Sequence, residues 1–63
     1  MDSDHAELSA LATTLDDLAT RITAVADRYR ASKRPDVADG IYEVERSLLA
    51  AARQLERVMR SMR

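Results

Sequence analysis

The chain of 63 residues contains no cysteine, phenylalanine or tryptophan, and it has only one proline and one glycine. Without cysteine the chain can form neither a disulfide framework nor a thiolate zinc site, and it has no thiol nucleophile. A reducing compartment is the expected setting. A chain of this length forms one small domain at most, so we treat residues 1–63 as a single unit.

Strong charge and long apolar runs are also missing. The formal net charge is −1, which gives no general attraction to nucleic acid or to an anionic membrane. No lysine or arginine precedes Arg21, so no secretory signal is expected. The longest apolar run, Leu48 to Ala52, is far shorter than the roughly 18 residues that span a bilayer. We expect a cytoplasmic protein without membrane association, and its alanine, arginine and aspartate usage is typical of bacterial proteins.

Large apolar residues follow a heptad pattern on both sides of the only interruption, at residues 33–40, which contains Pro35 and Gly40. Alternating spacings of three and four residues indicate amphipathic helices. They predict a helix over residues 5–32, a link over 33–35 and a second helix over 35–62. Because a short link joins helices of equal length, the expected fold is an all-α antiparallel helical hairpin.

The heptad residues form the expected hairpin core, with those of one helix facing those of the other. This predicted core consists of Leu8, Leu11, Leu15, Leu18, Ile22, Val25, Tyr29, Ile41, Val44, Leu48, Ala51, Leu55, Val58 and Met62. Each helix also begins acidic and ends basic, so antiparallel neighbours have complementary charges.

A second set of apolar residues lies beside the heptad row on each helix. This flank consists of Ala12, Ala19, Ala26, Ala38, Tyr42, Leu49, Ala52 and Met59. A lone hairpin would leave one set of apolar residues in water, whereas a second hairpin would cover it and complete a four-helix bundle. We therefore predict a homodimer that associates through the flank. Docking onto a different helical protein, a monomer and a higher oligomer stay open as alternatives.

No pattern indicates catalysis, a metal site or a cofactor. His5 is the only histidine and has no partner ligands on the second helix. Asp16 and Asp17 fall on the outer side of the first helix, where no pocket is expected for acid–base chemistry. No histidine is placed to activate a threonine hydroxyl. We expect a protein that is not an enzyme and has no small-molecule substrate.

Two basic groups could contact nucleic acid. Arg46, Arg53 and Arg60 recur every seven residues on the second helix, with Arg57 alongside. At the link, Tyr29 and Tyr42 are expected near one another among Arg28, Arg30, Lys33 and Arg34, and aromatic rings among basic residues can stack on unpaired bases. Solvated helix faces and tyrosines that cap a core are the simpler interpretations.

The sequence therefore predicts a non-enzymatic structural or protein-interaction module that self-associates through helix faces. The alternative is a nucleic-acid-binding regulator that uses the basic loop end or the arginine row of the second helix.

Overall fold

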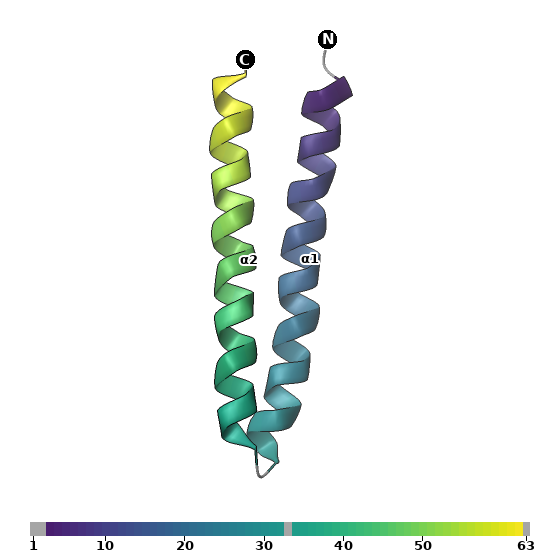
Figure 1. Cartoon of the computed structure of the whole chain (residues 1–63). Coiled ribbons are helices and arrows are strands. Elements are labelled where there is room, and N and C mark those ends of the chain that lie inside the picture. The colour runs from purple at the N-terminus through teal and green to yellow at the C-terminus, as the bar shows by residue number, and fades with distance from the viewer. Residues whose placement is uncertain (1–2, 33, 63) are drawn as a thin grey trace.

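The computed structural model describes residues 3–32 and 34–62 of the chain, and it contains two helices that pack against each other as a hairpin (Figure 1). Helix α1 comprises Ser3–Ala31 and helix α2 comprises Pro35–Ser61. Both chain ends lie at one end of the hairpin and the link lies at the other. The predicted all-helical hairpin is confirmed. Helix α1 begins two residues earlier than the expected residue 5 and ends one residue before the expected residue 32.

The link between the helices is stabilised by local hydrogen bonds. The Ser32 amide and hydroxyl both donate to the Tyr29 carbonyl oxygen, at 3.1 and 2.7 Å, and close the last turn of α1. Arg34 leaves the helical conformation, with φ −126° and ψ 59°, as expected for a residue that precedes proline. Pro35 then begins α2 at a position where its missing N–H needs no partner.

Alanine residues fill the space between the two helices. Ala12, Ala19 and Ala26 of α1 are 5, 2 and 0% exposed, and Ala38 and Ala52 of α2 are 1 and 3% exposed. Together with buried Met59 they form what we call the alanine stripe, whose members recur at multiples of seven along each helix. Half-buried Glu45 interrupts the stripe on α2. Because alanine is small, this contact permits a short distance between the helix axes.

The arrangement reverses the expected division between hairpin core and flank. Of the flank residues predicted to face a second hairpin, Ala12, Ala19, Ala26, Ala38, Ala52 and Met59 are instead buried within this one, and Tyr42 and Leu49 are half-buried. Of the predicted core, Leu8, Leu15, Ile22, Val25, Ile41, Leu48 and Leu55 are only half-buried. The remaining members, Leu11, Leu18, Tyr29, Val44, Ala51, Val58 and Met62, are exposed.

The physical reason for the reversal is that two helices share only one line of contact. The row that occupies this line must allow close approach along the whole hairpin, and the alanine stripe does so better than leucine does. The leucines then lie beside the line of contact or beyond it, where a single neighbouring helix covers them only in part.

The hairpin is elongated and has a large surface for its mass. Its Cα atoms extend over 51 × 14 × 9 Å, with a radius of gyration of 14.7 Å. A compact chain of this length would have a radius of gyration of about 11 Å. No described residue bulkier than alanine is buried, apart from Met59. Within the described residues, neither helix is long and apolar enough to cross a membrane.

Candidate interaction surface

Most large apolar residues of both helices lie on one side of the hairpin, whereas Tyr42 and Leu49 lie on the other side of the alanine stripe. On α1 this majority lies one and four positions before each alanine of the stripe and three positions after it. On α2 it lies at the same offsets from the stripe. Because the helices are antiparallel and face each other through the alanine stripe, equal offsets place both sets on the same side. We call this side the open face. It comprises Leu8, Leu11, Leu15, Leu18, Ile22, Val25, Tyr29, Val37, Ile41, Val44, Leu48, Ala51, Leu55, Val58 and Met62.

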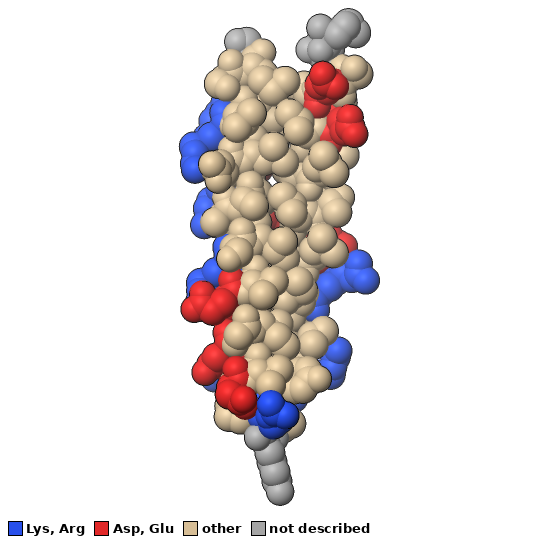
Figure 2. All heavy atoms as spheres, in the orientation of Figure 1, with Lys and Arg blue, Asp and Glu red and all other residues tan. Residues whose placement is uncertain are grey.

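Figure 2 shows a long uncharged strip of this kind, with charged side chains along its two edges. The most accessible large apolar side chains, from Leu18 at 36% to Val44 at 48%, all belong to the open face. Among the described residues, Met59 is the only large apolar residue that is buried. The open face therefore keeps a continuous apolar area that is available for contact with another molecule.

The open face has shallow hollows toward the loop end. One of about 450 Å³ is lined by Leu18, Arg21, Ile22, Ala24, Val25 and Arg28. Another of about 310 Å³ is lined by Val25, Arg28, Tyr29 and Ser32. Both are lined mainly by one helix and are open to solvent, so they fit the side chains of a docking partner better than a small ligand. They also place Arg21 and Arg28 at the border of the open face.

The two tyrosines at the loop end are separated from each other. Tyr29 lines the hollow beside Val25 and Arg28. The Tyr42 hydroxyl instead donates a hydrogen bond to the Asp27 carboxylate. Asp27 and Tyr29 are two positions apart and so point about 200° apart around α1. The tyrosines therefore do not form the shared stacking surface that the nucleic-acid alternative requires.

The hydrogen bond to Asp27 also changes the acidity of Tyr42. Because Asp27 accepts a hydrogen bond from the protonated hydroxyl, it raises the pKa of Tyr42 above its ordinary value, and partial burial acts in the same direction. Arg30 lowers the pKa of Tyr42 and offsets part of this effect. Sequence reasoning did not find the link between Tyr42 and Asp27, because the two residues lie on different helices and share no motif.

The basic residues predicted to contact nucleic acid are all exposed where the structure describes them, and they are dispersed. Arg28 borders the open face, whereas Arg30 lies near Tyr42 and Asp27. Arg34 pairs with Asp36 at 3.4 Å, and Arg46 pairs with Glu43. Exposed Arg53, Arg57 and Arg60 continue along α2, and Lys33 lies outside the described residues.

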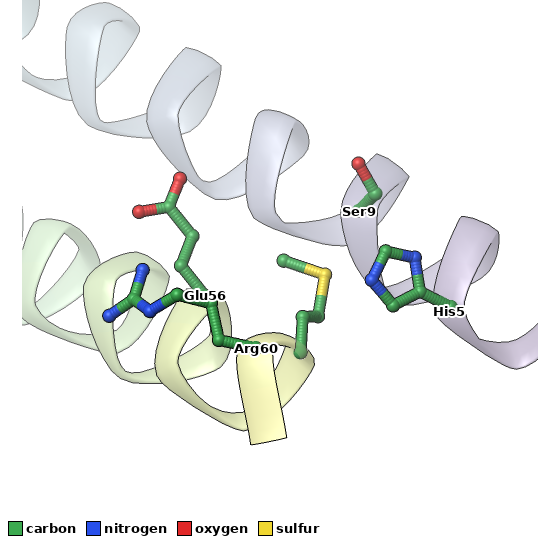
Figure 3. Close-up of a pocket in the computed structure, with 5 residues that line it drawn as sticks. His5, Ser9, Glu56 and Arg60 are labelled. Carbon is green, nitrogen blue, oxygen red and sulfur yellow. The ribbon is translucent and has the colours of Figure 1, made fainter. Parts of the chain in front are cut away.

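A pocket of about 340 Å³ lies between the helices near their free ends. It is lined by His5 and Ser9 of α1 and by Glu56, Met59 and Arg60 of α2 (Figure 3). His5 continues the alanine stripe, since it lies seven residues before Ala12. Its Nε2 atom is buried and has no hydrogen-bond partner among the described residues. His5 itself is half-buried.

The pocket holds a hydroxyl, an imidazole and a carboxylate, but the imidazole Nε2 atom has no hydrogen-bond partner among the described residues that would orient it. No group of three histidine, cysteine, aspartate or glutamate side chains comes together anywhere in the described part of the chain. Comparisons with protein-family models, with curated proteins and with solved structures found no match to this chain. The open face is therefore the feature on which a functional proposal can be based.

Proposed function

We propose that this protein is a small non-enzymatic module that self-associates by docking its open face on the open face of a second copy, which forms a four-helix bundle. One observation carries the proposal: most of the large apolar side chains lie together on one side of the hairpin, and several keep 36–48% of their surface accessible. Continuous exposed apolar patches of this size mark interaction sites on soluble proteins.

The area of the open face suits a stable dimer. The accessible surface of the hairpin is 4735 Å², whereas a compact monomer of 7.0 kDa would expose about 4,000 Å². The product of the two longer Cα extents, 51 and 14 Å, is about 700 Å². The excess of accessible surface over that of a compact monomer and the product of the two extents are both close to the roughly 800 Å² that each partner buries in a standard interface.

A second copy fits this face better than an unrelated surface does. It supplies a face of the same length that carries leucine, isoleucine and valine at heptad spacing on two helices. Two such faces bury each other's apolar rows and form the core of an antiparallel four-helix bundle. Docking of the same face onto a different helical protein is the alternative outcome of the test below.

Leu18→Asp tests the proposal because it places a charge at the centre of the open face. We expect the Leu18→Asp variant to lose the dimer and sediment at the chain mass of 7.0 kDa, with lower helicity in dilute solution. Thr20→Asp is the matched control, since Thr20 is an exposed residue two positions along the same helix and away from the open face. It should keep the mass of the unmodified chain. Equal masses for the unmodified chain and both variants would contradict the proposal.

The nucleic-acid alternative has less support. Its basic residues are dispersed over different sides of the hairpin, and Arg34 and Arg46 already pair with Asp36 and Glu43. We expect no change in the fluorescence anisotropy of labelled single-stranded RNA or duplex DNA at low salt. Binding that weakens steeply with added salt would favour the alternative.

A further inference from the structure

The charged residues next to the open face differ between the two helices. On α1, the row next to the open face on its outer side is Glu7, Thr14, Arg21 and Arg28, which we call the charged rim. Arg21 and Arg28 line the same hollow as Leu18, Ile22 and Val25, which places this rim beside the open face. Figure 2 shows acidic side chains near the free end of the α1 edge and basic side chains toward the loop.

On α2, the corresponding row is Gly40, Ser47, Gln54 and Ser61, which we call the neutral rim. A Cβ atom added at Gly40 would meet nothing within 4 Å, so this rim points away from α1. The charged residues of the α2 edge, among them Asp36, Glu43 and Arg57, lie one row further round the helix. Asp36 and Glu43 already pair with Arg34 and Arg46 of their own helix or link.

Two identical hairpins can join their open faces in two symmetric ways. If the two-fold axis is parallel to the helices, both loops lie at the same end, and α1 lies beside α2 of the second copy. If the axis is perpendicular to the helices, the loops lie at opposite ends. In that case α1 lies beside α1 of the second copy and α2 beside α2, with each pair antiparallel.

We propose that two copies associate with their loops at opposite ends. This inference rests on the proposed function, and it is favoured by the rims. With the loops at the same end, the charged rim would lie against the neutral rim, and the α2 charges level with Glu7 and Arg28, those of Arg57 and Asp36, would lie one row further away. With the loops at opposite ends, Glu7 lies beside Arg28 of the second copy, and symmetry forms this pair twice.

The ion pairs within the hairpin agree with this arrangement. Arg21 pairs with Asp17 of its own helix, at 3.9 Å, and needs no partner on the second copy. Among the ion pairs that the described residues form, none includes Glu7 or Arg28. The two residues that the arrangement brings together are thus the two charged rim residues without a partner in the hairpin.

The register on both helices is also consistent with this symmetry. On α1, an axis level with Leu18 places Leu18 against itself and Leu11 against Val25 of the second copy. On α2, an axis midway between Val44 and Ala51 places these two residues opposite each other. The two levels coincide in the hairpin. His5 of α1 lies level with Met59 and Arg60 of α2. Because the helices are antiparallel, Leu18, which follows His5 by thirteen residues, lies level with residues 46–47 of α2.

Charge reversal tests the rim pairing. Arg28→Glu should weaken the dimer by about 2- to 10-fold, because it removes two rim pairs and places like charges together. The double variant Glu7→Arg, Arg28→Glu should restore the affinity. No restoration would contradict the pairing, and an unchanged affinity for the single variant would contradict it as well.

Cysteine cross-linking tests the arrangement directly, since the chain has no other thiol. We expect oxidised Leu18→Cys to form a covalent dimer in high yield, because Leu18 meets its own copy at the axis. Thr20→Cys, on the same helix but away from the open face, should stay monomeric on a non-reducing gel. A mixture of Leu18→Cys and Val44→Cys chains should contain no mixed dimer by mass spectrometry, whereas loops at the same end would bring Leu18 close to Val44 of the second copy.

If the mixed dimer forms and the Leu18→Cys homodimer does not, the loops lie at the same end and the inference is overturned. The proposed function is tested separately by the solution mass of the unmodified chain. A dimeric mass with the wrong cross-link contradicts only the arrangement. A monomeric mass contradicts the self-association on which it rests.

Discussion

The Tyr42 hydroxyl of α2 donates a hydrogen bond to the Asp27 carboxylate of α1 and thereby connects the two helices near the loop. Since Asp27 raises the pKa of Tyr42, the folded chain holds the hydroxyl proton more tightly than the unfolded chain does. A raised pKa in the folded state stabilises the fold fully below the unfolded pKa of 10.0, and this contribution is lost as pH rises through the folded pKa.

Tyr42→Phe should remove this pH-dependent contribution. We expect the melting temperature to fall by a few degrees at pH 7 and the loss of stability of the unmodified protein above pH 10 to be reduced in the variant. Thermal denaturation followed by circular dichroism from pH 7 to 11 checks this. Tyr29→Phe is the control, because the Tyr29 ring lies in the hollow on the open face. Identical pH profiles for Tyr42→Phe and the unmodified protein would contradict the role of this hydrogen bond.

Ala19→Leu should destabilise the hairpin because Ala19, at 2% exposure, lies where the two helices approach each other. Overpacking of such a site costs about 1–3 kcal/mol of the free energy of unfolding. Ala10→Leu is the matched control, since Ala10 is exposed on the same helix. Urea denaturation of both variants measures the difference. Equal stabilities would mean that the alanine stripe is not the line of contact.

His5→Leu should stabilise the hairpin. The substitution replaces a buried nitrogen that has no hydrogen-bond partner among the described residues with an apolar side chain next to Met59. Relief of one unsatisfied polar group raises the free energy of unfolding by about 1 kcal/mol. His5→Gln, which keeps a polar group at this position, should give no such gain. A lower melting temperature for His5→Leu would show that the imidazole has a favourable contact.

Gly40→Ala should also stabilise the protein. Gly40 lies within α2, where glycine costs about 1 kcal/mol relative to alanine, and a Cβ atom there would meet nothing within 4 Å. The expected increase in melting temperature is roughly 4–8 °C. Calorimetry checks this, with Ala50→Gly in the same helix as the reverse control, which should lower the melting temperature. A decrease for Gly40→Ala would mean that a second copy approaches the backbone at this position.

The helices and the hairpin were predictable because their causes are local. Leucine and isoleucine recur at helical spacing, and Pro35 with the preceding Arg34 forms the single interruption. The heptad pattern also separates the leucine row from the alanine row. It does not determine which row faces the other helix, because that choice depends on how closely two helices can pack.

Leu18 and Ala19 illustrate this limit. They are adjacent in the sequence, and the prediction placed Leu18 inside the hairpin and Ala19 outside it. The structure has the opposite arrangement, with Leu18 36% exposed and Ala19 2% exposed. Apolar character alone favours burial of the larger residue, whereas a single helix pair favours the residue that permits the closest approach. The contact between Tyr42 and Asp27 was not predictable for a related reason, since it depends on the register between the helices.

In the proposed dimer, a second copy of this chain covers the open face. The most direct test is the solution mass of the unmodified protein by light scattering across a dilution series, with circular dichroism on the same samples. We expect a mass of twice 7.0 kDa with high helicity, and loss of both together at the highest dilutions. A fully helical chain with a mass of 7.0 kDa at every concentration would contradict it.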